Sequence, residues 1–230
     1  MTGSEMPDPK DLLLDAALMH VPFDGWTEVT WEAALADVDV NPVVANALCP
    51  RGALDLAVAY HHRGDALMLD RLAAADLGEM RFRDRIAAAV RFRLEVVEDK
   101  ELVRRGMTLF ALPHHAAEGT RLVWGTVDHI WTALGDSSDD VNWYTKRATL
   151  SGVYSSTLLY WLGDDSEDHA ASWEFLDRRI ENVMQFEKLK AGVRDNKLLS
   201  GVLKGPLAVL ERIKAPASAR NDLPGSLNNR

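Results

Sequence analysis

The sequence predicts an all-α protein, and three observations carry that prediction. Apolar residues recur every three or four positions through most of the chain, which is the spacing of one helix face. Nowhere do apolar and polar residues alternate for long, as they would along a half-buried strand. Helix-capping side chains, prolines and glycines divide the chain into segments of helical length. The 230 residues fit one large domain, or one domain with a small appended module.

Composition narrows the class of protein further. Hydrophobic residues make up 47% of the chain and charged residues 27%, as in an ordinary soluble protein. The single cysteine, Cys49, rules out an internal disulfide framework and agrees with a reducing compartment. The first ten residues are polar and acidic, and no run of about 18 apolar residues occurs, so we expect neither a signal peptide nor a membrane span. The net charge of −9 argues against a protein that coats nucleic acid.

After a loose tail over residues 1–9, the segment 10–75 predicts a head of three short helices and one long helix. The first ends near Val21-Pro22 and Gly25, the second follows a cap at Thr27, the third opens at Asn41, and the long helix fills the rest. This order and spacing resemble the DNA-binding head of the tetracycline-repressor family. The resemblance implies a helix-turn-helix whose second helix would enter the major groove.

The chemistry of this head disagrees with DNA binding. The segment Asn41 to Cys49, which matches the recognition helix, contains no Lys, Arg, Ser, Thr or Tyr. Residues 1–60 hold two basic residues against ten acidic ones, a balance of −8. Such a surface repels phosphates, so we expect a degenerate head without a nucleic-acid partner.

Residues 76–189 are expected to form the helical body. A basic helix is predicted over residues 81–105, with most arginines facing solvent. A break at Pro113 precedes the next long helix, and an acidic turn over residues 164–168 precedes the last one. The apolar stripe of the basic helix is Phe82, Ile86, Val90, Leu94 and Val97, and that of the last helix is Trp173, Leu176, Ile180, Val183 and Met184.

The centre of the body is the segment from Asp136 to Leu162. Ser138, Asp139 and Asp140 are expected to cap this helix. One broad face carries residues at intervals of three or four: Trp143, Arg147, Leu150, Tyr154, Leu158 and Trp161. Core packing accounts for most of them. The adjacent pair Trp143-Tyr144 fits a core stripe less well, because neighbours on a helix diverge by roughly 100°. We therefore expect one of the two rings at the surface, as part of a partner site.

The segment 190–215 predicts an amphipathic helix that associates with membranes. Residues 188–214 carry seven Lys and Arg against two acidic residues, a balance of +5 on an acidic protein. A wide apolar face beside a positive rim is typical of an interfacial helix, although a terminal helix docked on the body or on a second subunit has the same pattern. The apolar positions assigned to the membrane are Leu198, Leu199, Val202, Leu203, Leu207 and Leu210. Residues 216–230 are expected to be a disordered tail.

No motif nominates an enzyme. The dinucleotide fingerprint, the phosphate-binding loop and the nucleophile elbow are absent from the sequence. None of the seven histidines has the spacing of a helical di-iron or zinc site, so no metal and no catalytic residue is assigned. Seven tryptophans remain, and they either pack a core or line an apolar ligand cavity between helices.

Two strings carry a more specific resemblance. GDSSDDVNWYTKR at residues 135–147, with its continuation ATL, and SWEFLDRRI at residues 172–180 resemble the coenzyme Q biosynthesis accessory family often called COQ-nine. The similarity covers roughly residues 10–215 and is strongest over 120–186. The resemblance implies a repressor-like homodimer without DNA recognition that binds isoprenoid lipids in a hydrophobic cavity. It also implies a C-terminal membrane helix and a partner, the di-iron hydroxylase that acts on demethoxyubiquinone.

Transferred position by position, the resemblance places the partner patch at Asp140, Trp143, Tyr144 and Arg147, with Ile130 on the preceding helix in place of the Met of some relatives. No short motif marks the lipid pocket. Apolar helical spacing alone suggests Phe110, Trp124, Trp131, Tyr154 and Leu158 for it.

The resulting hypothesis is a non-enzymatic accessory protein of ubiquinone biosynthesis. It would bind an isoprenoid lipid or quinone precursor and present it to the hydroxylase, as a cytoplasmic protein on the inner face of the membrane. The alternative is a ligand-responsive transcription regulator of the tetracycline-repressor type, which only the layout of the head supports.

Overall fold

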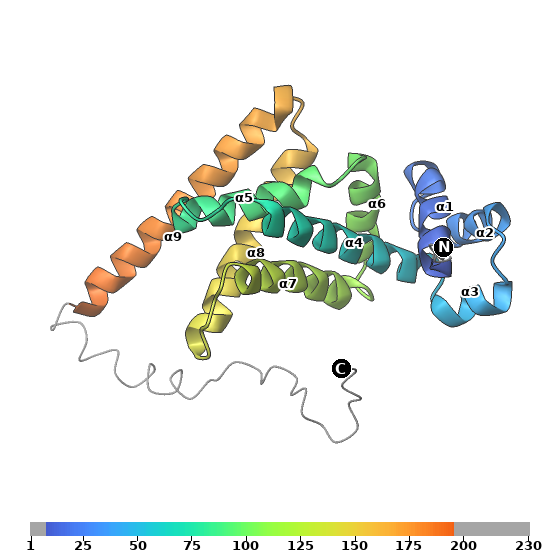
Figure 1. Cartoon of the computed structure of the whole chain (residues 1–230), viewed down its shortest axis with the longest axis horizontal. Helices are drawn as coiled ribbons and strands as arrows, with labels where there is room; N and C mark the ends of the chain where they lie inside the picture. Colours follow the sequence, from blue (N-terminus) through green and yellow to red (C-terminus); the bar gives the residue numbers. More distant parts are fainter. Residues whose placement is uncertain (1–7, 196–230) are drawn as a thin grey trace, which may run out of the picture.

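The computed structural model describes residues 8–195, with side chains through residue 185, and that part of the chain is helical and free of strands (Figure 1). The predicted all-α class is therefore confirmed. Both expected tails and the expected membrane helix beyond residue 195 lie outside the described residues. The described elements are α1 Pro9–Asp24, α2 Glu28–Asp37, α3 Pro42–Leu48, α4 Ala53–Ala74, α5 Phe82–Glu95, α6 Lys100–Phe110, α7 Ala116–Ala133, α8 Val141–Leu162, the short 3₁₀ helix η1 Glu167–His169 and α9 Ala170–Asp195.

The head consists of α1, α2, α3 and the first turns of α4. Asp8 caps α1 by accepting a hydrogen bond from the Lys10 amide at 2.8 Å, and Asn41 caps α3 in the same way through Val43. The end of α1 agrees with the expected stop near Val21-Pro22 and Gly25, and Pro22 itself lies inside the helix. The helix continues to Asp24 and ends at Gly25, whose φ of +71° favours glycine.

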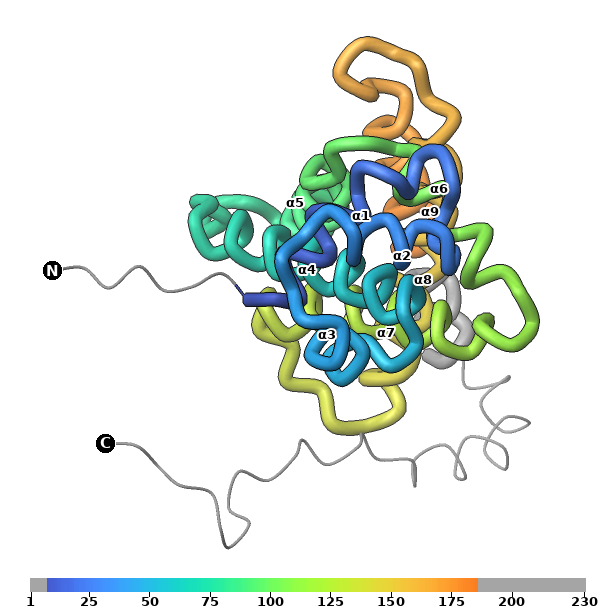
Figure 2. The backbone as a smooth tube through the Cα atoms, turned by 90° about the vertical axis from the view of Figure 1, so that its right-hand side faces the viewer, coloured from blue at the N-terminus to red at the C-terminus, as the bar shows by residue number. Residues whose placement is uncertain are grey.

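The fourth helix joins the head to the body and contributes to both cores. Its first turns place Leu56 and Ala57 in the head core, and its last turns place Met68 and Leu72 in the body core. Figure 2 looks onto the head from its end, with α1, α2 and α3 in front of the body. A single helix, α4, therefore contributes side chains to the core of the head and to the core of the body.

The predicted basic helix over residues 81–105 is wrong as a single element. The structure has two helices, α5 and α6, which Val96 to Asp99 separate. Asp99 starts α6 by accepting a hydrogen bond from the Glu101 amide at 2.7 Å. The apolar spacing runs on across this break, so periodicity could not reveal it. The turn sends α6 towards the head, where Arg105 donates to the carbonyl oxygen of Pro22.

In the body, α8 packs against α7 and α9, and α5 packs against α4, α7 and α9, with α9 forming the edge farthest from the head (Figure 1). The predicted face of α8 is largely buried, including Leu150, Tyr154 and Trp161. Leu176 and Ile180 of α9 are buried against it as expected. Met184, expected to face inward, is 36% exposed instead.

The helix at the recognition position, α3, exposes apolar side chains. Val43 is 78% exposed, and Val44 and Leu48 are also exposed, whereas a groove-reading helix presents polar and basic side chains. The exposed surface of α3 therefore contains no basic side chain, and the head that carries it is acidic.

Candidate functional site

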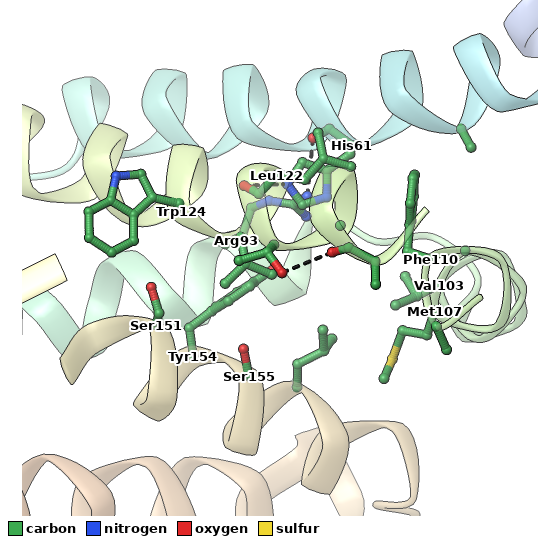
Figure 3. Close-up of a pocket in the computed structure, with 18 of the residues that line it drawn as sticks. His61, Arg93, Val103, Met107, Phe110, Leu122, Trp124, Ser151, Tyr154 and Ser155 are labelled. Carbon is green, nitrogen blue, oxygen red and sulfur yellow. Dashed lines mark hydrogen bonds between the residues drawn. The ribbon is translucent and has the colours of Figure 1, made fainter. Parts of the chain in front are cut away.

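A cavity of about 740 Å³ lies in the body beside the head, among α4, α5, α6, α7 and α8. Its size falls within the range of roughly 300–1,000 Å³ usual for ligand sites. Figure 3 shows Val103, Met107 and Phe110 of α6 on one side, with Tyr154 and Ser155 rising from α8. The lining is mostly apolar, so the cavity suits a hydrocarbon chain.

Four of the five residues suggested for lipid binding line this cavity: Phe110, Trp124, Tyr154 and Leu158. Trp131 does not. Its ring packs against Phe82 at 5.7 Å, and its indole N–H donates to the carbonyl oxygen of Lys146 at 3.3 Å. Seven residues advance a helix by about 10 Å, so Trp124 and Trp131 share a face of α7 but lie at different depths. Periodicity identifies the face, and the position of the cavity along the helix decides which residue reaches it.

Glycine allows two close approaches around the cavity. A Cβ on Gly64 would lie 2.6 Å from a terminal nitrogen of Arg93, so the guanidinium occupies the space beside α4 that a side chain would fill. A Cβ on Gly119 would lie 2.8 Å from the Cβ of Phe110. Gly64 therefore lets α5 approach α4 closely, and Gly119 lets α6 approach α7 closely.

Sequence reasoning missed a buried charged pair at the cavity wall. Arg93 is 6% exposed and Asp65 2% exposed, and Arg93 Nε donates to Asp65 Oδ1 at 2.7 Å. Thr126 donates to the same oxygen at 2.8 Å, and Arg93 Nη2 donates to the carbonyl oxygen of His61. Most arginines of this segment were expected to face solvent. Arg93 instead neighbours the stripe residues Val90 and Leu94 on α5, and that position was the available signal.

His61 also lines the cavity, and its environment makes a pH dependence testable. Burial, followed by the charge of Arg93, lowers the pKa of His61 to about 4 from its usual 6.5. Its Nε2 lies 2.9 Å from the Thr126 hydroxyl and 3.2 Å from the carbonyl oxygen of Leu122. The folded protein therefore holds the ring neutral in a pH range where the unfolded chain protonates it.

We expect the free energy of unfolding to fall as the pH drops from about 6.5 to about 4, by up to ~3 kcal/mol from His61 alone. Stability is full above the unfolded pKa because neither state then binds the proton. The free energy of unfolding of His61→Gln, measured with urea at several pH values, should depend less steeply on pH between about 4 and 6.5. The matched variant His62→Gln, at an exposed neighbouring position, should keep the pH dependence of the wild type. The same pH dependence in both variants would contradict the role given to His61.

The segment that resembles the accessory family forms a network at the start of α8. Asp140 caps the helix by accepting a hydrogen bond from the Asn142 amide at 2.8 Å. Ser138 and Asp139, expected to assist, do not cap it, and Ser138 binds Asp136 instead. Lys146 donates to Asp136 at 2.7 Å, which ties the preceding loop to the helix.

Arg147 lies at the centre of this network. Its Nε donates to Asp128 of α7 at 2.6 Å, and its Nη1 donates to Asp136 at 3.0 Å. Its guanidinium lies 4.0 Å from the centre of the Trp143 ring. Burial alone would raise the pKa of Asp136, but hydrogen bonds from Lys146, Ser138 and Arg147 hold it at about 2. Much of the family-specific string thus stabilises the α7–α8 junction.

The five residues of the expected partner patch do not form one open surface. Ile130 is fully buried and Arg147 is 2% exposed, so neither offers a contact as placed, which corrects their expected position. Asp140 is exposed, while Trp143 and Tyr144 are both half-buried, with rings 4.8 Å apart edge to face. Helical divergence predicted one exposed ring. The Arg147 guanidinium and the ring of Trp124, 5.9 Å away, cover part of Trp143 instead.

The described part of the chain contains no group of three His, Cys, Asp or Glu side chains placed to hold a metal ion. Among the same residues, no helix is long and apolar enough to cross a membrane. The membrane positions assigned from sequence, Leu198 to Leu210, lie outside them.

Comparison with known proteins extends these observations. Residues 116–187, which cover α7, α8 and most of α9, match the family model COQ9. The chain is 33% identical over 206 residues to the "Ubiquinone biosynthesis protein COQ9, mitochondrial" of Drosophila melanogaster, covering 81% of this chain and 62% of that protein. The human protein of the same description is 27% identical over 182 residues, covering 75% and 56%. The chain thus spans about three fifths of the length of these relatives.

Among solved structures, a TetR transcriptional regulator from Nitrosomonas europaea superposes with a TM-score of 0.62 at 21% identity, covering 76% of this chain and 97% of that one. At this identity the likeness shows the fold alone. It confirms the repressor-like architecture expected from the head. The match over residues 116–187 and the identity to these relatives confirm the resemblance to the COQ9 family that the string over residues 135–147 predicted.

Proposed function

We propose that this chain acts in ubiquinone biosynthesis as a non-catalytic accessory protein that binds an isoprenoid lipid or quinone precursor. The observation that carries the proposal is the cavity of about 740 Å³ with its apolar lining. Relatives named as ubiquinone biosynthesis proteins supply the pathway. The metabolites of that pathway carry long prenyl tails, and an apolar cavity can shield part of such a tail from water.

Energetics favour exchange with a membrane over permanent storage. Moving a prenyl tail out of water contributes about 0.8 kcal/mol per buried CH₂ group. A tail that moves from the bilayer into this cavity passes between two apolar environments, so most of the free energy of transfer out of water cancels. We therefore propose a protein that works peripherally at the inner face of the membrane and takes up the precursor there, with residues 190–215 as the contact.

The partner in this proposal is the di-iron demethoxyubiquinone hydroxylase. It would dock at the start of α8, where Asp140 is exposed and the half-buried rings of Trp143 and Tyr144 reach the surface. A homodimer is also proposed. On α8 and α9, Leu159 is 58% exposed, and the exposed Tyr160 ring stacks on Phe175 at 4.6 Å, which suits an interface between two copies.

The transcription-regulator alternative receives less support. The TetR likeness concerns fold alone, and the exposed side chains of α3 include Val43, Val44 and Leu48. Direct readout of DNA needs donors and acceptors at these positions. We therefore propose that the chain has no nucleic-acid partner.

Native mass spectrometry of the full chain purified from its own membranes tests lipid binding. We expect a bound isoprenoid lipid on the wild type and its loss in Gly152→Leu. Gly152 lines the cavity, and a Cβ there would meet nothing within 4 Å, so the added side chain fits the fold and takes up cavity space that the lipid would fill. The matched control is Gly125→Leu on α7, which has equally open space but does not line the cavity.

The outcomes separate three roles. Lipid on the wild type and on Gly125→Leu, but not on Gly152→Leu, supports the proposal. An empty wild-type protein that still captures the hydroxylase would replace lipid presentation with a scaffold role. An empty protein that captures nothing would contradict both.

A further inference from the structure

The turn between α1 and α2 of the head exposes three large apolar side chains. Phe23 is 80% exposed and Met19 is 72% exposed, and the two lie one turn apart on the same face of α1. Val29, which is 59% exposed, follows in the first turn of α2. Single exposed apolar residues are normal on a protein surface, but three of them around one short turn indicate a surface that binds another molecule. We call these three residues the apolar corner.

Acidic side chains border the apolar corner. Asp24 is the last residue of α1, and Glu28 and Glu32 lie one turn apart on α2. All three are exposed, and none of them has an ion-pair partner among the residues that the structure describes. The basic side chain that reaches this turn, Arg105, is already paired with Glu101 at 2.9 Å. Unpaired carboxylates around an apolar surface favour a partner that is both apolar and positively charged.

The chain itself contains a segment of this chemistry. Residues 196–214 lie outside the described part of the structure, and their sequence holds four Lys and Arg against one acidic residue. Eight further residues of this segment are Leu, Val or Ile, which are costly to expose to water. Residues 1–60 carry a balance of −8, so the head attracts a segment whose balance is +3.

A second copy of the chain has to supply this segment. The last described helix ends at Asp195, and Figure 1 shows α9 at the edge of the molecule farthest from the head. Only two residues separate Asp195 from Leu198, the first apolar residue of the segment, and a chain extends by at most about 3.6 Å per residue. The start of the segment therefore cannot reach the head of its own chain across the body. Two copies that exchange their segments form a closed pair.

We propose that the apolar corner and its carboxylates bind residues 196–214 of a second copy in water, and that an anionic membrane competes for the same segment. The docking site on the head goes beyond the binding of lipid, and only the competition rests on the membrane contact proposed above. On the head, the segment shields its apolar side chains from water. At an anionic bilayer, lipid phosphates replace the carboxylates and acyl chains replace the apolar corner.

A fluorescently labelled synthetic peptide of residues 196–214 tests the docking site on the purified full chain, with fluorescence anisotropy as the measurement. We expect the double variant Met19→Ser with Phe23→Ser to bind the peptide about tenfold more weakly than the wild type, because the apolar contact is lost. The double variant Glu28→Gln with Glu32→Gln should bind about fivefold more weakly and with a smaller dependence on salt, since two attractive charges are removed.

Two exposed positions away from the apolar corner provide matched controls. Val43→Ser changes a valine of α3 that is 78% exposed, and Asp70→Asn changes an exposed carboxylate of α4. Both variants should bind the peptide like the wild type. Vesicles of phosphatidylglycerol and phosphatidylcholine in equal parts should release the peptide from the wild-type chain, whereas vesicles of phosphatidylcholine alone should release much less of it.

The outcomes separate the docking site from the membrane contact. Equal peptide affinities of the wild type and the Met19→Ser, Phe23→Ser variant would overturn the site. A loss of binding in Val43→Ser alone would place the segment on α3 and overturn it as well. Equal release by both kinds of vesicle would overturn the competition for charge. A full chain that binds neither kind of vesicle would overturn the membrane contact, and the peptide measurements would still decide the docking site.

Discussion

Replacing Asp65 by asparagine is expected to lower the free energy of unfolding by about 3–5 kcal/mol, because it leaves the guanidinium of Arg93 buried without its counter-charge. For a chain of this size the melting temperature should fall by roughly 6–20 °C. The side chains of Asp and Asn are almost isosteric, so the loss reports charge and not packing. Thermal and urea unfolding would measure it.

Two further variants test whether the loss of stability comes from the unpaired charge. Asp70→Asn changes an exposed carboxylate on the same helix and should shift stability by no more than about 0.5 kcal/mol. The double variant Asp65→Leu with Arg93→Met removes both charges and should recover part of the loss, since an apolar pair can replace a buried ion pair. A loss below about 1 kcal/mol for Asp65→Asn would show that Arg93 finds another partner or water.

Replacing Arg147 by methionine is the second change with a large expected effect, a loss of about 3 kcal/mol. Arg147 connects Asp128 of α7 with Asp136 of the loop and supports the ring of Trp143. Arg147→Lys should lose nearly as much, because an ammonium group cannot hold two carboxylates with the geometry of a planar guanidinium. The exposed Arg178→Met on α9 is the control and should be almost neutral.

The same variant should change the acid sensitivity of the fold. With a folded pKa of about 2, Asp136 contributes stability above its usual pKa near 3.8, and that stability is lost as the pH falls through about 2. Without Arg147 the folded pKa rises, so the contribution shrinks and disappears at a higher pH. Unfolding curves between pH 2 and 5 would detect the shift. Unchanged acid sensitivity in Arg147→Met would mean that Lys146 and Ser138 hold Asp136 by themselves.

Sequence analysis singled out Arg147 but not Arg93, although both are buried in the structure. Arg147 lies in a string that carries the resemblance to the COQ9 family, and several side chains of this string connect α7, the following loop and α8. Arg93 is one of several arginines on a helix whose arginines were mostly expected to face solvent, and nothing in the sequence singled it out. A side chain's partner across the fold, here Asp65 of α4, cannot be read from spacing along one helix.

In the cavity too, helical spacing predicts some of the lining residues and only the packing of the helices reveals the others. Helical spacing identified four of the five suggested residues on the cavity wall, because residues at intervals of three or four share a face. It also selected Trp131, which packs beyond the end of the cavity, and it omitted His61, Arg93 and Ser151. Depth along a helix and the contribution of other helices depend on how the helices cross, which local patterns do not encode.

The sequence by itself determined the helical class, most helix boundaries, the acidic head without DNA-reading side chains and the resemblance to the COQ9 family, because these depend on local spacing, capping and composition. The tertiary structure alone decided that the segment 81–105 breaks into two helices and that a buried ion pair faces an apolar cavity. It also decided which parts of the family string reach the surface. The reason is physical: burial and charge pairing arise between segments far apart in the chain, and only packed helices create a cavity.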